Sequence, residues 1–541
     1  VVVDHRREQI VGGADRMEIA GEVEVDVLHR HDLGITAAGG AALALNFLGR
    51  TAADQDSSKV VKAEVTESIF RVTGDTTVSA TSTSTIRSAG VAAGASGTTA
   101  INGSNATNLL EDEVTAYWYN SAVMPRVANR TLVLATQAAT IESLAGNLSG
   151  TGGVAVGAAV AVNRIGTDTH ATMTAGTGTV RTDTMVLSDE TRVSADSSNE
   201  ISTIAVGMSA GTAGAQGAVA VSVIDSDTQA MMGGNNYLTN VSARGTVAVT
   251  ANSQDRIRAL AGAASLGVAG AGLAGGVLTN IITSNTVAAI DGGNVHVEGA
   301  GQGNGITVKG PGLSGKPDLM AINKVTDSVM GGAAFETRNA KGVVIQATSI
   351  QQIGALTAVA GGGVVGAGAA VNVDRIGGRT RAYMDASPFV NIGAPSAELV
   401  YDRTPSASQA LDVMAANHAL VASSTTAVAV GGSAVGAAVG TELIDRSTRA
   451  EILNSQVKAA GAVVVNAVST NTVAQISVGI GGGGVGIGVA GSGDAAIVKG
   501  ETVARIANSN VSADSISVTA DGSNHFNLIA GSVGEIGRAH V

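Results

Sequence analysis

Hydrophobic and small residues alternate along much of the chain, and the stretch from Val154 to Val162 shows the pattern most clearly. Four valines and one alanine occupy every second position there, and only alanine and glycine stand between them. A period of two residues is the geometry of a β-strand, in which successive side chains point to opposite faces. The pattern therefore predicts a strand whose branched side chains pack in a core. Its other face is expected to let a second layer approach closely or to form a smooth outer wall.

The same pattern recurs in tandem. Five further segments combine a run of Gly, Ala and Val with a short polar break and the tripeptide Thr-x-Ala, namely 214–232, 270–290, 363–384, 432–452 and 484–506. The threonines that mark the register are Thr169, Thr228, Thr286, Thr380, Thr448 and Thr502, at spacings of 59, 58, 94, 68 and 54 residues. A unit of about 55 to 60 residues that recurs in this way predicts stacked copies of one architectural element.

The irregular spacings predict insertions. The interval of 94 residues is expected to hide a degenerate copy, with Ser328 at the register position. Five of the six prolines lie between residues 311 and 405, which also predicts loop insertions near 300–320 and 386–410. Residues 131–534 are thus expected to form the tandem repeats, and residues 1–130 leading, atypical copies.

A second phrase recurs between the glycine-rich runs. Short Val, Ile and Ala alternations are interrupted by Asn, Asp, Ser or Gly every five to eight residues in segments 186–198, 238–253, 452–469 and 506–523. Asn and Gly suit the left-handed backbone of tight turns, so the phrase predicts strand, corner and strand. Stacked strands with such corners predict an all-β protein, an elongated β-solenoid in which each coil bonds to the next.

A membrane-spanning helix is the competing interpretation of the apolar runs, because segment 429–440 contains closely spaced small residues. The glycine content opposes a helix, since each Gly costs about 1 kcal/mol relative to Ala. Most of the runs are also shorter than the ~20 residues that cross a bilayer, and they lack cationic flanks and aromatic belts. No transmembrane segment is expected.

Composition narrows the range of functions. The 541 residues include 73 glycines and 45% hydrophobic residues but only 2% aromatic residues. These values predict a thin core of small aliphatic side chains rather than the thick core and lined pocket of a large enzyme. A net charge of −12 argues against nucleic acid as a partner. The absence of cysteine excludes a disulfide framework and thiol chemistry.

Both ends of the sequence suggest a gene fragment. The chain opens "VVVDHRREQI", without Met and without the apolar core of a secretory signal. The closing residues 535–541 match the in-frame translation of a common sequencing adapter. We therefore expect a truncated sequence and exclude residues 535–541, with His540 among them, from the fold prediction.

These patterns support a resemblance to a known group of proteins. The combination of "GAAVAVN" runs with Thr-x-Ala and "SNVSADSISVTA" phrases, over roughly residues 130–534, resembles the repeat regions of large Gram-negative exoproteins. These are the filamentous-haemagglutinin and leukotoxin-like adhesin families, which are exported by two-partner secretion. The resemblance implies a right-handed parallel β-helix that is displayed on the cell surface or shed from it.

Few residues offer chemistry. His29, His31 and Asp32 would lie together on a strand, but a metal site needs three or four convergent ligands, and surface histidines are the simpler interpretation. Two acidic groups could bind calcium, which prefers oxygen ligands from short acidic loops; they are Glu111, Asp112 and Glu113 in one segment and Asp225 and Asp227 in another. Neither group has a complete calcium motif, so both are expected to be solvated turns.

Other motifs belong to the repeat. The Gly-x-Gly stretches recur too often to be a dinucleotide fingerprint. The threonines of segment 76–88 would suit an ice-binding ladder, but the ladder is not maintained at one register in other copies. Trp118 and five tyrosines provide few aromatic platforms for a carbohydrate cleft. We predict no catalytic, cofactor-binding or metal-binding residue and no cofactor.

The resemblance and the composition together predict a non-enzymatic function. The expected role is a structural or adhesive stalk segment of a secreted exoprotein, located outside the cell or on the outer bacterial surface. The expected partners are a receptor or glycan on a host or neighbouring cell and an outer-membrane secretion partner. The alternative is a β-helical polysaccharide-processing enzyme or carbohydrate-binding fragment, which an acidic cleft on one face would favour.

Overall fold

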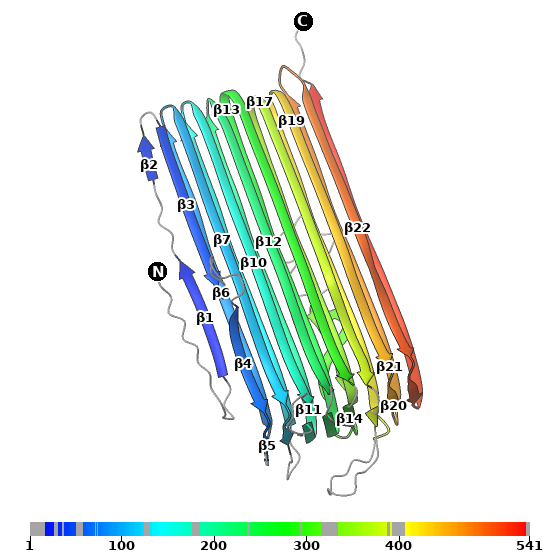
Figure 1. Cartoon of the computed structure of the whole chain (residues 1–541). Helices are drawn as coiled ribbons and strands as arrows, with labels where there is room; N and C mark the ends of the chain where they lie inside the picture. The colour runs from blue at the N-terminus through cyan, green and yellow to red at the C-terminus, as the bar shows by residue number, and fades with distance from the viewer. Residues whose placement is uncertain are drawn as a thin grey trace.

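The computed structural model is all-β and is built around one large sheet of long parallel strands (Figure 1). It describes residues 17–25, 31–34, 37–49, 58–70, 72, 74–123, 130–175, 184–234, 239–292, 295–314, 334–386, 390–391 and 406–536. The large sheet contains 19 strands and folds into two facing walls. Both walls belong to one sheet because several strands run continuously through the turn that joins them. The predicted all-β fold is confirmed, and the arrangement is compatible with a β-solenoid.

Each passage of the chain contributes one strand to each of two facing walls. The first wall contains β1 (Met17–Val25), β2 (His31–Gly34), β6 (Thr76–Ser96), β9 (Arg130–Thr151), β11 (Thr184–Gly211), the first parts of β13 (Thr239–Gly292), β17 (Gly342–Ala386) and β19 (Ala410–Leu453), then β21 (Ala462–Gly483) and β24 (Ser515–Ile536). The second wall contains β3 (Ala37–Leu48), β4 (Lys59–Thr66), β7 (Thr99–Tyr119), β10 (Val154–Ala175), β12 (Ala213–Gly234), the second parts of β13, β17 and β19, and β22 (Gly488–Ala507).

Short strands lie at the end of the walls opposite to the tight turns. They are β5 (Ile69–Phe70), β8 (Ala122–Val123), β14 (Val295–Gly299), β18 (Val390–Asn391), β20 (Gln456–Lys458) and β23 (Asn510–Ser512). The corners that lead into them contain Asn120, Asn454 and Asn508, whose φ angles are 47°, 47° and 52°. The predicted use of Asn at left-handed corners is confirmed at these positions.

Neighbouring long strands of the same wall pair in parallel. The six threonines that mark the register lie in one row across the second wall, because Thr169 pairs with Thr228 and each later mark pairs with the next. Thr286 pairs directly with Thr380. The copy expected around Ser328 is therefore wrong, because no strand lies between these two; Ser328 itself is outside the described residues.

Part of the long interval forms a hairpin instead. β15 (Ile306–Ser314) pairs with β16 (Ala334–Ala340) in the antiparallel direction. The hairpin packs Ile306 and Val308 against Ala248 and Val344 on the outer face of the first wall. The interval is long because it holds an excursion that covers this wall. An extra copy of the repeated unit does not explain its length.

The core lies between the walls and changes along the strands. An isoleucine row from the second wall, containing Ile165, Ile224 and Ile282, packs against an isoleucine row from the first wall, containing Ile141 and Ile201. Near the tight turns the core consists mainly of alanine, glycine and serine, with a few larger side chains such as Gln216 and Val359. Between these layers run buried polar ladders, such as the one in which the amide of Asn46 donates to Asn108 at 2.8 Å and that of Asn108 donates to Asn163 at 2.7 Å.

The alternation in β10 points the opposite way from the prediction. Ala155, Ala159 and Ala161 are fully buried, whereas Val154 and Val156 are 49% and 37% exposed. The expectation that the branched residues fill the core is wrong here. The walls approach closely near the turns, so most of the positions between them hold small side chains. The valines are left on the outer surface.

This close approach gives a direct test. A Cβ at Gly272 would lie 1.9 Å from the backbone oxygen of Gly362, whereas a Cβ at Gly275, three residues along the same strand, would meet nothing within 4 Å. We expect Gly272→Ala to destabilise the protein by about 3 kcal/mol, as overpacking of a rigid core does. Gly275→Ala, the control, should leave the thermal unfolding midpoint nearly unchanged. Equal midpoints for the two variants would contradict the close approach.

Candidate functional site

The outer face of the second wall carries both aliphatic and charged side chains. Residues of β7, β10, β12, β13, β17, β19 and β22 stand in rows that cross the strands, because the parallel pairing is in register. The rows near the tight turns are aliphatic or small, and we call this region the apolar half. The rows nearer the short strands hold most of the charged side chains, and we call this region the charged half.

The charged half changes sign along the row of strands. Acidic residues dominate on the earlier strands, with Glu111 and Glu113 on β7, Asp168 on β10 and Asp225 and Asp227 on β12. Basic residues outnumber carboxylates on the later strands taken together. The arginines are at positions 375, 379 and 381 of β17, 449 of β19 and 505 of β22, with Lys499 also on β22, and the carboxylates are Asp445, Glu451 and Glu501. Two clusters at the opposite ends of this gradient are candidates for binding.

The first cluster contains Asp168, His170 and Asp227. Each can offer one ligand atom, and the three atoms lie within 4.8 Å of one another. Asp168 pairs directly with Asp227 across β10 and β12, and His170 follows two residues later on the same face. An imidazole and two carboxylates suit a divalent transition metal. The Asp227 oxygens already accept hydrogen bonds from the Gln229 amide at 3.0 and 2.9 Å, so a metal would have to displace this contact.

The electrostatics of this cluster centre on Asp168. Partial desolvation by neighbouring side chains raises the pKa of the Asp168 carboxyl, although the residue is exposed. His170 lowers this pKa, and the nearby carboxylates of Asp227, Glu113 and Asp225 raise it further. A raised pKa and a neighbouring carboxylate are what general acid catalysis by a carboxyl pair requires. The pair lies on the open outer face of a wall rather than in a closed cleft.

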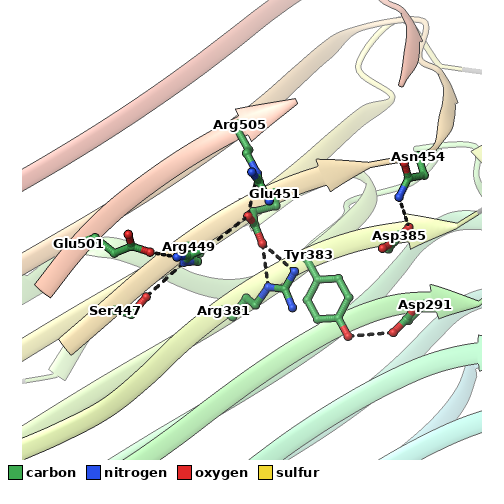
Figure 2. Close-up of polar contacts among 10 residues, drawn as sticks. All are labelled: Asp291, Arg381, Tyr383, Asp385, Ser447, Arg449, Glu451, Asn454, Glu501 and Arg505. Carbon is green, nitrogen blue, oxygen red and sulfur yellow. Dashed lines mark hydrogen bonds and ion pairs between the residues drawn. The ribbon is translucent and has the colours of Figure 1, made fainter. Parts of the chain in front are cut away.

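The second cluster surrounds a buried carboxylate (Figure 2). The side chain of Glu451 has no exposed surface, and its oxygens form ion pairs with Arg381 at 2.7 Å, with Arg505 at 2.9 Å and with Arg449 at 3.9 Å. Arg449 also pairs with Glu501. Three arginines from three neighbouring strands thus converge on one carboxylate, because their register places them in adjacent rows.

Tyr383 extends this cluster. The Arg381 guanidinium lies 3.9 Å from the centre of the Tyr383 ring, and the Tyr383 hydroxyl donates to Asp291 at 2.9 Å. Burial and the hydrogen bond to Asp291 raise the pKa of Tyr383 to about 12. The phenol therefore stays protonated and holds β13 and β17 together on this face.

Glu451 is expected to stabilise this part of the wall. Glu451→Gln leaves Arg381, Arg449 and Arg505 without their shared counter-charge, so the variant should lose about 3 kcal/mol of folding free energy. The matched control is Glu501→Gln, which removes an ion pair whose carboxylate is 48% exposed and should cost less than about 1 kcal/mol. Chemical denaturation measures both. A loss for Glu451→Gln no larger than that for Glu501→Gln would refute the assignment.

The structure separates the first of the two acidic groups that the sequence suggested and leaves Asp225 and Asp227 together on one face. Both segments lie in the middle of strands, β7 and β12, so the expectation of solvated turns is wrong. Asp112 points into the core, where the hydroxyl of Ser84 donates to it at 2.6 Å and Lys59 lies 3.9 Å away. Its neighbour Glu111 faces outwards and pairs with Arg164 at 3.7 Å. Alternation along a strand sends consecutive carboxylates to opposite faces.

The other candidates have different outcomes. His29 lies outside the described residues, and only the backbone of His31 and Asp32, in β2, is described. Trp118 is fully buried, and the centre of its ring lies 5.6 Å from the centre of the Phe70 ring. It therefore cannot serve as a platform for a sugar. On the outer face of β6, Thr81 and Thr85 pair with Thr136 and Thr140 of β9, but β11 continues these two rows with Asp196 and Glu200. The threonine ladder therefore ends after two strands.

A set of buried charges was not predicted at all. Asp255, Asp374, Glu442 and Arg446 all point between the walls. Asp255 accepts hydrogen bonds from Asn199, Ser226 and Ser253 at 2.7 to 3.0 Å. These groups form a polar seam in the core and are closed off from any ligand. Their role is in stability.

Two further findings bear on function. Within the described part of the chain there is no helix with the length and apolar character to cross a membrane. Comparisons with known proteins found no matching family model, no similar curated protein and no similar solved structure.

Proposed function

We propose that the chain is a structural or adhesive stalk segment of a large secreted bacterial surface exoprotein, built as a right-handed β-solenoid from degenerate repeats of about 55 to 60 residues. It belongs outside the cell or on the outer bacterial surface. It presents binding regions to a receptor or glycan on another cell and is exported through an outer-membrane partner. The repeat patterns and the resemblance described above motivate the export route and the partners.

One observation carries the proposal, namely the unbroken parallel pairing along both walls. Strands such as β10 contain 22 residues, so each boundary between neighbouring passages is closed by two long ladders of hydrogen bonds. Buried rows of isoleucine and asparagine continue across these boundaries. Bonds loaded side by side share an applied force. Such a structure can therefore transmit tension without changing its length, as a stalk must.

The mechanical role is testable on the full chain. The protein is tethered through residues near its two ends and stretched in an optical trap. We expect it to keep its length until the coils open in large, discrete steps. Gradual lengthening at low force would overturn the stalk proposal, because a compliant body cannot hold a binding region at a fixed distance.

A polysaccharide-processing enzyme is the second candidate, and the pair formed by Asp168 and Asp227 favours it. The experiment is incubation of the protein with a panel of acidic and neutral polysaccharides, followed by detection of new reducing ends. Activity that Asp168→Asn abolishes, with the fold intact by circular dichroism, would replace the stalk proposal. If no polysaccharide in the panel gives new reducing ends, the stalk proposal stands and the enzyme proposal is rejected.

A further inference from the structure

The apolar half of the second wall is an uncovered aliphatic surface. Val277, Val371 and Val439 stand in one row across three neighbouring strands and are 41%, 36% and 46% exposed. Beside this row, a hollow of about 430 Å³ is floored by glycine and alanine and bordered by Val156, Leu273 and Val435. The β15–β16 hairpin covers part of the first wall, but no described element packs on this region. Exposed aliphatic surfaces of this extent mark interaction sites.

The size of the apolar half fits a stable protein interface. Seven strands about 4.8 Å apart, each with about eleven residues that rise about 3.3 Å, cover roughly 1,200 Å². A specific interface needs about 800 Å² per partner. A flat sheet face of this kind packs best on another flat sheet face, at a separation of about 10 Å.

The charge pattern of the charged half determines how a second sheet face can be oriented on this surface. When the same face of two copies meets, the two-fold axis lies in the plane of the interface. An axis along the strands keeps the apolar halves opposite each other and reverses the order of the strands. The acidic strands of one copy then lie over the basic strands of the other. An axis across the strands would instead place apolar rows on charged rows, which the pattern disfavours.

We propose that a second copy of this chain docks on the outer face of the second wall, about a two-fold axis that runs along the strands near β13. In this dimer β12 of one copy lies over β17 of the other. Asp227 then lies opposite Arg379, and Asp225 lies opposite Gly377, between Arg375 and Arg379, at each of two symmetric contacts. The apolar halves bury each other, and the charges select the orientation. This proposal is independent of the mechanical role.

A charge exchange tests the orientation. One variant has Arg375→Glu and Arg379→Glu, and the other has Asp225→Lys and Asp227→Lys. Each variant alone should dimerise at least tenfold more weakly than the parent at low ionic strength, in sedimentation experiments, because like charges then face each other at both contacts. An equimolar mixture should form a heterodimer with affinity close to that of the parent, because both contacts become complementary. If each variant dimerises weakly and the mixture also dimerises weakly, the proposed orientation is wrong.

The apolar contact is tested with a matched pair of variants. Val277→Lys places a charge in the middle of the proposed interface, and Ile204→Lys places one on the outer face of the first wall at the same 41% exposure. Only Val277→Lys should produce a monomer, with both variants folded by circular dichroism. A parent protein that is monomeric at high micromolar concentration would overturn the proposal. Binding to phosphatidylcholine vesicles that Val277→Lys removes from such a monomer would assign the face to a membrane.

Discussion

Replacing Arg446 with methionine is expected to be among the most damaging single substitutions in the chain, with a loss of about 4 kcal/mol of folding free energy. The Arg446 side chain is 2% exposed and lies between the walls. Its Nη1 donates to the backbone oxygens of Ser284 and Gly377 at 2.7 and 2.6 Å, and its Nη2 donates to Thr380 at 2.9 Å and to Asn417 at 3.1 Å.

The size of this loss follows from what remains after the substitution. Burial lowers the pKa of Arg446 to about 10, so the guanidinium is still charged at neutral pH, and Asp255 is the charge that favours it. Methionine fills much of the volume but leaves the acceptors unpaired and Asp255 without its nearby cation. Removing one member of a buried charged network costs about 3 to 5 kcal/mol. Thermal and chemical unfolding measure the change.

A surface arginine provides the control. Arg87 pairs with Glu142 at 3.0 Å, and both side chains are about half exposed. Arg87→Met should change the stability by less than about 1 kcal/mol, because exposed ion pairs contribute little. If Arg446→Met proved as stable as Arg87→Met, the hydrogen-bond network around Arg446 would have no energetic importance and the assignment would fail.

Arg446 also shows what the sequence can and cannot reveal about the core. Period-two alternation predicts which residues share a face, and it places Arg446 on the same face as Thr448 and Ala450. It does not say which face is inside. The space for the guanidinium depends on Gly378 of the neighbouring strand, whose φ is 113° and whose added Cβ would lie 2.8 Å from Arg446 Nη1. Alignment on Thr380 and Thr448 places Gly378 beside Arg446, but it does not show that the arginine points between the walls.

The valines of β10 illustrate the same limit. Hydrophobicity alone favours branched residues inside, but the close approach of the two walls, as between Gly272 and Gly362, favours small side chains near the turns. The candidate cluster is different, because a signal for it exists in the sequence. Alignment on Thr169 and Thr228 places Asp168 beside Asp227, so the register marks predict this contact once the strands are known to be parallel.

The stability of the protein is expected to fall as the pH rises from about 4 to about 8. Burial raises the pKa of Asp374 to about 7 and that of Glu442 to about 8, although Asn280 and Asn372 donate to the first and Ser423 to the second. The negative charges of Asp374 and Asp494 raise the pKa of Glu442 further.

The stability falls with rising pH because the two carboxyls ionise at different pH values in the folded and unfolded states. In the unfolded chain both carboxyls ionise near pH 4, whereas in the folded protein they hold their protons until about pH 7 and 8. The folded state therefore binds more protons across this window. The stabilisation is complete below about pH 4 and is lost as the pH passes the folded pKa values. A shift of this size corresponds to a few kcal/mol per group.

Neutral variants isolate this contribution. Asp374→Asn and Glu442→Gln remove both charges, so the double variant should gain stability over the parent at pH 9 and show a flatter dependence of unfolding free energy on pH between 5 and 9. Asp445→Asn is the control, because Asp445 is exposed on the outer face of the same wall. Its profile should follow that of the parent. A double variant whose profile is as steep as that of the parent would show that both carboxyls are ionised in the folded core. Their burial between the walls would then not govern their titration.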